Sequence, residues 1–154
     1  MKKLRIYIDT SIVGGYFDKE FSKETRELFQ RLNNKEVIFV ISSLLLQELS
    51  NAPQVVKNLL DKYDKNSFEY VYLTAEAETL AAQYIKENIV GKTSLDDCRH
   101  ISIATVNKVD VLASWNFKHI VNFGKIRGYN GVNLKNGYSP IEIRNPKELL
   151  NYEK

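Results

Sequence analysis

The chain has 154 residues, 44% of them hydrophobic, which fits one compact domain spanning residues 1–154. Its single cysteine, Cys98, excludes an internal disulfide framework and is expected to be a packed thiol; with no signal-peptide pattern and no apolar run long enough to cross a bilayer, we expect a cytoplasmic protein without a membrane partner. The net charge of +3, from 22 Lys and Arg against 19 Asp and Glu, permits contact with a polyanion without requiring it.

The first predicted element is a buried strand over residues 4–8, LRIYI, which leads directly into a carboxylate, Asp9. Residues 22–34 then carry apolar side chains at helical spacing, which predicts an amphipathic helix with Ser22 as its N-cap. Asp9 alone is explained equally well as the cap of the following turn. A functional interpretation depends on whether other carboxylates reach the same place.

The next segment predicts another strand followed by helices. The continuous run of branched apolar residues over 36–42 predicts a second buried strand. Ser42 or Ser43 is expected to cap a helix over residues 44–52. A proline then begins or separates a further helical segment over residues 53–64.

The second half of the chain continues the alternation. Residues 70–74 predict a third strand, and the Ala- and Leu-rich segment 75–89 strongly favours a helix. A helix with acids in its first turn is expected over residues 94–108, followed by a short strand within residues 109–114. One further strand within residues 139–146 precedes a short C-terminal helix.

Strands that are apolar on both faces and alternate with helices are typical of a mostly parallel sheet covered by helices on both sides. We therefore expect an α/β protein with three layers, α/β/α. In such sheets, ligands bind in the crevice outside the carboxyl ends of the strands. Asp9 directly follows the first strand and should point into this crevice.

More oxygen ligands are expected at the same edge of the sheet. Glu48 lies among leucines on the helix after the second strand, where an acid is costly. Asp96 and Asp97 open the helix with acids in its first turn, and Asn116 follows the fourth predicted strand. Repulsion among these acids would raise their pKa values unless a cation neutralised them. All-oxygen ligation suits Mg²⁺ or Mn²⁺ rather than Zn²⁺.

Three segments carry these residues in a familiar order: YIDTS with Asp9, QELSN with Glu48, and DDCRHISIATVNKVDVLASWNFKHI with Asp97, Ser114 and Asn116. From residue 3 to about residue 149 the chain resembles a PIN domain of the bacterial VapC-like toxin kind. The resemblance implies a three-layer PIN-like fold with a mostly parallel central sheet. It also favours Asp97 over its neighbour as the third acid, because the helix pattern that follows Asp97 is similar to that of the family.

The resemblance implies a Mg²⁺- or Mn²⁺-dependent ribonuclease that cleaves phosphodiester bonds within RNA, acting as the toxin of a toxin–antitoxin pair. The implied catalytic positions are Asp9, Glu48, Asp97 and Asn116, with Asp9 and Asp97 as metal ligands and Glu48 as a ligand through water. An RNA substrate, a cognate antitoxin and a homodimer are the implied partners. Many PIN domains carry a fourth acid where this chain has Asn116, which can offer a carbonyl oxygen but no charge. This departure weakens the case for a second tightly bound ion.

Supporting roles are expected for the neighbours of these positions. Thr10 and Ser11 could contact the phosphate or Asp9 through hydroxyl or N–H groups, and Ser114 could support the site from another strand end. Asp96 is a weaker candidate ligand, because the helix dipole already explains an acid in the first turn.

Several other polar residues lie close to these motifs in sequence. Arg99, Lys118 and His119 are candidates for gripping the RNA backbone, and His119 by itself is expected at the surface. His100 is expected to form hydrogen bonds or pack rather than act as a general base. Trp115 either covers the sheet edge or stacks on a base.

Two rival functions are considered. A non-catalytic or weakly catalytic RNA-binding PIN domain is motivated by Asn116. A response-regulator type of Mg²⁺-binding domain fits less well, because the first strand ends in one acid and no glycine-rich phosphate loop is present. Residues 124–144 interleave basic and aromatic side chains, which favours single-stranded RNA binding and turn packing equally.

Overall fold

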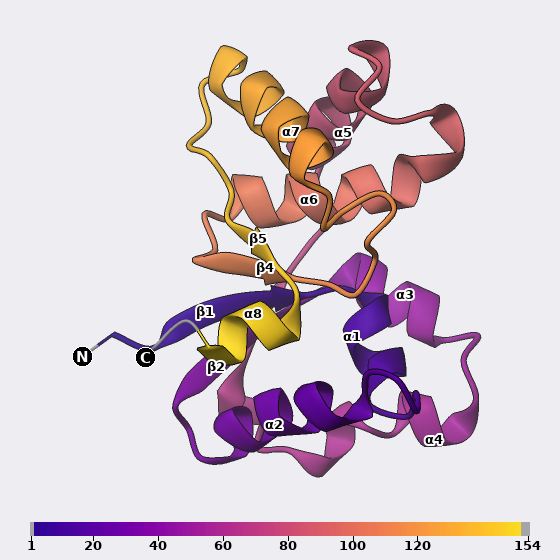
Figure 1. Cartoon of the computed structure of the whole chain (residues 1–154), viewed down its shortest axis with the longest axis vertical. Helices are drawn as coiled ribbons and strands as arrows, with labels where there is room; N and C mark the ends of the chain where they lie inside the picture. Colours follow the sequence, from indigo (N-terminus) through magenta and orange to yellow (C-terminus); the bar gives the residue numbers. More distant parts are fainter. Residues whose placement is uncertain (1, 152–154) are drawn as a thin grey trace.

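The computed structural model describes residues 2–151 and places a parallel sheet at the centre of the molecule (Figure 1). Within this range the sheet has five strands in the order β3-β2-β1-β4-β5, and every neighbouring pair is parallel. The strands are β1 (Leu4–Ile8), β2 (Val37–Ser42), β3 (Phe68–Val71), β4 (Val111–Ala113) and β5 (Ile143–Arg144).

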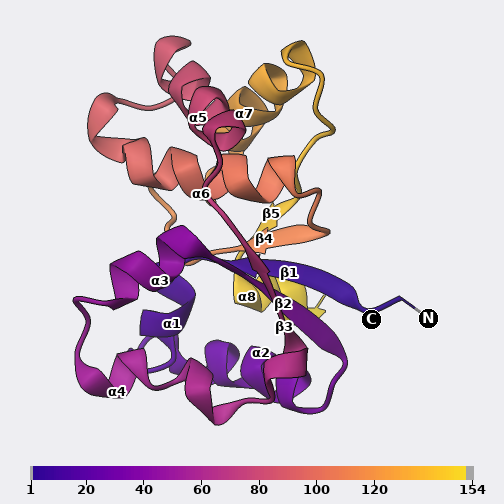
Figure 2. The same ribbon diagram turned by 180° about the vertical axis from the view of Figure 1, so that it is seen from behind.

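Helices cover both faces of this sheet, as the two opposite views show (Figures 1 and 2). The helices α5, α6 and α7 lie on one face, and α1, α2 and α8 lie on the other. The predicted three-layer α/β/α architecture is therefore confirmed. Within residues 2–151, none of the helices combines the length and apolar character that crossing a bilayer requires. The helices are α1 (Thr10–Gly15), α2 (Ser22–Asn33), α3 (Ser43–Leu49), α4 (Gln54–Lys57), α5 (Ala75–Lys86), α6 (Leu95–Val106), α7 (Phe123–Lys135) and α8 (Pro146–Asn151).

The central strand β1 shows why its sequence is apolar throughout. Successive side chains of a strand point to opposite faces, so Ile6 and Ile8 enter the core cluster beneath α1 and α2, whereas Tyr7 enters the cluster beneath α5 and α6. All three side chains are almost completely buried. A strand covered on both faces has no solvent side on which a polar residue would be favourable.

The strand order creates a switch point beside β1. From β1 the chain moves outward through β2 to β3, and it then returns to the other side of β1 to form β4 and β5. Ile8 pairs with Ala113 in the β1–β4 register. The residues that directly follow these two, Asp9 and Ser114, therefore lie side by side at the carboxyl edge, where ligands of such sheets bind.

Several predicted boundaries differ from the structure. The third strand covers Phe68–Val71, two residues earlier at its start than expected. The helix expected over residues 53–64 is broken into α4 and a 3₁₀ turn at Leu60–Lys62. The break lies at Leu59, which is fully buried and whose N–H donates to the carbonyl of Val56 at 3.2 Å, a three-residue bond that turns its side chain toward the core.

The expected N-cap of α2 is also wrong. Ser22 is the first helical residue, and Phe21 occupies the N-cap position without a side-chain hydrogen bond. The N–H of Ser22 donates to the carbonyl of Asp18 at 2.8 Å, so the preceding turn pairs the first N–H of this helix. At α3 the prediction holds, because the Ser42 hydroxyl accepts from the N–H of Leu45 at 3.0 Å.

Most of the segment 124–144 forms α7, a helix that the sequence did not predict. Asn122 caps it by accepting from the N–H of Lys125 at 3.2 Å. Gly128 serves close packing rather than a turn, since a Cβ atom there would lie 2.8 Å from Cδ1 of Ile89. Tyr129 is fully buried, so packing explains this aromatic residue.

Candidate metal-binding acid cluster

Asp9 is fixed by donors from two strand ends. Its carboxylate caps α1 by accepting from the N–H of Ile12 at 3.3 Å, and the same Oδ1 atom accepts from the Ser11 hydroxyl at 2.6 Å. The Ser114 hydroxyl donates to Oδ2 at 2.5 Å. Only 4% of Asp9 is exposed, and this burial raises its pKa above the ordinary value although the three donors oppose the shift. Burial therefore outweighs these donors in setting the direction of the pKa shift of Asp9.

Glu48, on α3, is fixed from one side only. The Thr10 hydroxyl and Nε2 of His100 both bind the same oxygen, Oε1, the latter at 2.7 Å. Partial burial raises the pKa of Glu48, but the hydrogen bonds from His100 and Thr10 outweigh it, so the pKa lies below the ordinary value. Within residues 2–151, Oε2 receives no hydrogen bond and is left available to a ligand.

Asp97 is half-buried in the first turn of α6, and its Oδ1 accepts from the side-chain amide of Asn116 at 3.2 Å. Burial raises the pKa of Asp97, and the negative charges of Asp9 and Glu48 raise it further, while the His119 imidazole partly offsets them. The charges of Asp9 and Glu48 therefore both act on Asp97.

Asp96 lies outside this cluster. It is exposed and forms an ion pair with Arg99 at 2.8 Å. Successive residues of a helix point about 100° apart, so Asp96 and Asp97 cannot occupy the same face of α6. The structure places Asp97, and not Asp96, beside the other acids.

The sequence suggested that the side-chain carbonyl oxygen of Asn116 could bind a metal, but this oxygen has another partner. Its Oδ1 accepts from the backbone N–H of His119 at 3.0 Å, which identifies the oxygen and turns the amide nitrogen toward Asp97. Its own backbone N–H donates to the Ser114 hydroxyl at 2.9 Å. Asn116 therefore cross-links Ser114 and Asp97 and presents a donor, rather than an acceptor, to the acids.

The supporting residues divide between Asp9, which follows β1, and Glu48 on α3. Ser11 and Ser114 both donate to Asp9, as expected. Thr10 binds Glu48 instead of Asp9, because it is the first residue of α1 and its side chain reaches α3. Ser11 also accepts from the N–H of Trp115 at 2.8 Å, which ties α1 to the end of β4.

Arg99 and His119 are two of the side chains expected to contact the RNA backbone, and the structure places both in surroundings that differ from those expected. Arg99 lies between two acids, at 2.6 Å from Glu78 and 2.8 Å from Asp96, so its charge is already neutralised. His119 is half-buried rather than at the surface, and its Nδ1 is the one buried side-chain polar atom of the described chain without a hydrogen bond. Lys118 is exposed, as a backbone-binding residue would need to be.

Trp115 packs inside the molecule. Its ring stacks on Phe21 with 4.3 Å between centroids, and its indole N–H donates to the Thr25 hydroxyl at 2.8 Å. A Cβ atom at Gly15 would lie 2.7 Å from the indole ring, so the glycine makes room for it. Trp115 therefore covers the sheet edge, and the exposed aromatic ring beside it is Phe117.

Sequence reasoning missed the connection of His100 to Glu48. His100 lies three residues after Asp97, hence on the same face of α6, and this spacing was the available signal. The structure joins His100 to Glu48 and Asn116 to Asp97 by hydrogen bonds, so His100 is added to the candidate site of Asp9, Glu48, Asp97 and Asn116.

The side-chain oxygens of the three acids are the kind of ligand that a hard divalent cation binds. The acids offer only oxygen, and the charges of Asp9 and Glu48 on Asp97 are of the kind that a cation relieves. Among residues 2–151, however, no three His, Cys, Asp or Glu side chains form a ready-made ligand set. Mg²⁺ commonly binds through one or two carboxylates and retains several waters. The residues therefore fit Mg²⁺ with few direct protein ligands and do not fit a closed zinc-like cage.

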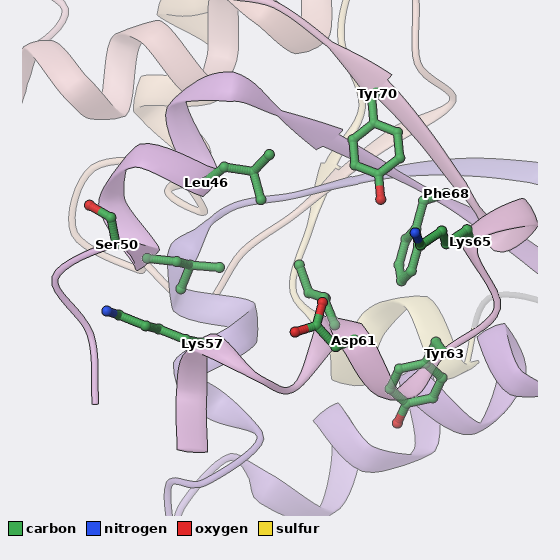
Figure 3. A pocket seen from close by; sticks show the side chains of 10 residues that line it. Leu46, Ser50, Lys57, Asp61, Tyr63, Lys65, Phe68 and Tyr70 are labelled. Carbon is green, nitrogen blue, oxygen red and sulfur yellow. The ribbon is translucent and has the colours of Figure 1, made fainter. Parts of the chain in front are cut away.

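One cavity of the described chain, about 510 Å³ in volume, lies away from these acids, between α3, α4 and the edge strand β3 (Figure 3). None of the acids of the cluster lines it. Its lining is mixed, with apolar and charged side chains that include Leu46, Tyr63, Phe68, Lys57 and Asp61. The acid cluster and this cavity are therefore separate features of the molecule.

Comparison with solved structures shows which known fold this arrangement has. A chain of the FitAcB structure from Neisseria gonorrhoeae superposes with a TM-score of 0.59 at 14% identity, covering 92% of this chain and 98% of that chain. A chain of the VapBC2 structure from Rickettsia felis, bound to promoter DNA, gives 0.58 at 18% identity, covering 92% and 98%. This chain has a VapC-like PIN fold.

The PIN fold also relates the chain to VapC20 of Mycobacterium tuberculosis, described as a sarcin-ricin loop cleaving toxin. The TM-score is 0.57 at 12% identity, over 73% of this chain and 91% of that chain. No protein-family model and no curated protein sequence matches the chain. Structure therefore identifies the fold where sequence comparison finds no relative.

Proposed function

We propose that this PIN-fold protein is a Mg²⁺- or Mn²⁺-dependent endoribonuclease that hydrolyses phosphodiester bonds of RNA. The observation that carries the proposal is the meeting of Asp9, Glu48 and Asp97 near the carboxyl ends of β1 and β4, where burial and then the charges of the first two acids raise the pKa of the third. Three acids that repel one another are costly to the fold, and a cation bound among them removes that cost. A metal-dependent activity would account for this arrangement of three acids, whereas packing does not.

Each side chain has a defined part in this proposal. Asp9 and Asp97 would hold the cation directly, and Glu48 would hold it through water with its available Oε2 atom. The bound cation would activate a water molecule and offset negative charge on the scissile phosphate. Ser11 and Ser114 keep both oxygens of Asp9 in place, and Lys118 is exposed to bind the RNA backbone.

The similar structures support a place in a toxin–antitoxin pair. One is described as a toxin that cleaves the sarcin-ricin loop, and another as a toxin–antitoxin complex from Klebsiella pneumoniae. The proposal therefore includes toxin activity and a cognate antitoxin as partner. The homodimer implied by the sequence stays a prediction, which the mass of the purified protein in solution would test.

The experiment is cleavage of an end-labelled, mixed RNA pool by the purified protein with Mg²⁺, with Mn²⁺ and with EDTA. Two adjacent variants give a matched comparison: Asp97→Asn removes a proposed ligand, whereas Asp96→Asn removes an exposed acid outside the cluster. We expect cleavage by the native protein and by Asp96→Asn in either metal, and none with EDTA or by Asp97→Asn. Equal cleavage by the two variants would refute the assigned site.

A second function, RNA binding without cleavage, is favoured by one observation. Asn116 brings no charge, and its amide donates to Asp97 where a fourth carboxylate would have added a ligand. A protein that shifts RNA in a gel but leaves it intact with every metal would support this alternative.

A further inference from the structure

The hydrogen bonds to Glu48 are arranged unevenly. Both donors, Thr10 and His100, bind Oε1, and within the part of the chain that the structure describes Oε2 has no donor. A carboxylate whose donors gather on one oxygen has its rotation fixed and its other oxygen presented. What fixes the donors therefore decides where Oε2 lies.

The state of His100 toward Glu48 follows from the acceptor chemistry. Ionised carboxylates only accept hydrogen bonds, so at 2.7 Å from Oε1 the Nε2 atom of His100 must carry the hydrogen. This conclusion is independent of whether Nδ1 is also protonated.

The imidazole is itself held by buried groups on two strands. The Tyr7 hydroxyl on β1 lies 2.6 Å from Nδ1 of His100 and 2.9 Å from the hydroxyl of Ser42, which ends β2. His100 is 3% exposed and Tyr7 and Ser42 are 0% exposed. The chain Ser42–Tyr7–His100–Glu48 thus links β2, β1, α6 and α3, and only its Glu48 end is partly exposed.

This burial is unusual for a packing role alone. A phenol and an imidazole placed inside the sheet cost desolvation unless their polar atoms are paired, and an apolar pair would avoid that cost. Here the paired polar atoms of Tyr7 and His100 belong to a chain of hydrogen bonds that ends at Glu48. This chain starts in the strands of the sheet rather than in a loop.

We infer that His100 is a positioning residue, which donates through Nε2 to Glu48 and is oriented by Tyr7, so that Oε2 of Glu48 faces the acid cluster. The consequence for catalysis rests on the proposed function, whereas the hydrogen bond itself does not. Residues that orient metal ligands in this way typically change metal affinity or activity by roughly 10- to 100-fold when they are replaced.

The first test reads the hydrogen bond without activity. The chain has two histidines, so ¹⁵N NMR of the imidazoles gives two sets of signals, and His119→Gln assigns them. We expect a hydrogen on Nε2 of His100, and a ¹³C shift of the Glu48 carboxyl group that moves in His100→Leu but much less in His100→Gln, which keeps a side-chain N–H donor. A neutral ring with its hydrogen on Nδ1 alone, or an unmoved Glu48 signal in His100→Leu, would overturn the inference.

The second test measures the consequence. Mn²⁺ affinity by calorimetry and cleavage of the mixed RNA pool should each fall roughly 10- to 100-fold in His100→Leu, with most of both restored in His100→Gln. Tyr7→Phe keeps the ring and removes only the hydroxyl, so its Mn²⁺ affinity and its RNA cleavage should also fall, but by less. This variant replaces His100→Leu in the test if His100→Leu does not fold. Unchanged Mn²⁺ affinity in a folded His100→Leu variant contradicts the positioning role. If His100→Leu does not fold, unchanged Mn²⁺ affinity in Tyr7→Phe contradicts it. If the native protein neither binds Mn²⁺ nor cleaves RNA, the proposed function fails, and NMR still decides the bond to Glu48.

Discussion

Asp9 and Glu48 lie in one cluster but are stabilised in opposite ways. Asp9 is almost fully buried and its pKa is raised, although three donors bind it. Glu48 is only partly buried, and two donors are sufficient to lower its pKa. The number of hydrogen bonds therefore does not decide the direction of the pKa shift, because the deeper burial of Asp9 outweighs its donors. Burial therefore dominates the pKa of Asp9, whereas hydrogen bonds dominate that of Glu48.

The largest expected effect separates these two acids by activity. Asp9→Asn should reduce RNA cleavage by roughly 1000-fold or more, because it removes a proposed direct ligand, whereas Glu48→Gln should reduce it by roughly 10- to 100-fold, as for a residue proposed to act through water. Initial rates on the mixed RNA pool at saturating Mg²⁺ would measure both. A larger loss for Glu48→Gln would reverse the assignment of direct and indirect ligands.

The next effect concerns the donors that hold Asp9. Ser114→Ala removes a buried hydrogen bond to a carboxylate, so the free energy of unfolding should fall by about 1–3 kcal/mol. Ser139→Ala changes an exposed serine and should stay within about 0.5 kcal/mol. Denaturant unfolding in metal-free buffer compares them, and equal stabilities would mean that the Ser114 hydroxyl does not serve Asp9.

The opposite pKa shifts predict opposite pH dependences in metal-free buffer. The folded pKa of Asp9 lies above its ordinary 3.8, so its contribution to the free energy of unfolding decreases as pH rises from below 3.8 through the folded pKa. The folded pKa of Glu48 lies below its ordinary 4.5, so its contribution is fully present above 4.5 and is lost as pH falls through the folded value.

Two variants separate the pH-dependent contributions of Asp9 and Glu48 to the free energy of unfolding. Between about pH 3 and about pH 7, Asp9→Asn should become progressively more stable relative to the native protein, and Glu48→Gln progressively less stable. Both curves come from denaturant unfolding at several pH values with EDTA present. Slopes of the same sign for the two variants would contradict the contrast between the acids.

The smallest expected effect concerns Asn116. Asn116→Asp replaces the amide that donates to Asp97 with another acid, so it should lower the metal-free stability and tighten Mn²⁺ binding severalfold. Calorimetry with Mn²⁺ and unfolding with and without the metal would measure both changes. Weaker Mn²⁺ binding with unchanged stability would place this side chain outside the cluster.

The sheet and the acids were predictable because their signals are local or follow from topology. The apolar run of β1 and the acid after it placed Asp9 at the carboxyl edge, and a parallel sheet with β4 beside β1 then brought Ser114 to it. Asp97 rather than Asp96 followed from the resemblance to PIN domains, and the geometry of α6 agrees with it.

The rest depends on tertiary contacts that no local pattern shows. The helix α7 contains three glycines, which lower helix propensity, yet Gly128 is needed for the close approach of Ile89. The partner of Thr10 could not be foreseen, because the approach of α1 to α3 decides it. The same is true of His119, whose half-buried ring looks like a surface residue in the sequence.

The central claim is that the acids of the cluster bind one cation together although no three of them form a ready-made ligand set. Calorimetric titration of Mn²⁺ into the native protein, Asp97→Asn and Asp96→Asn tests it most directly. We predict binding by the native protein and by Asp96→Asn, and an affinity weakened by roughly 100-fold or more in Asp97→Asn. Equal affinities of the two variants, or no binding by the folded native protein, would contradict the claim.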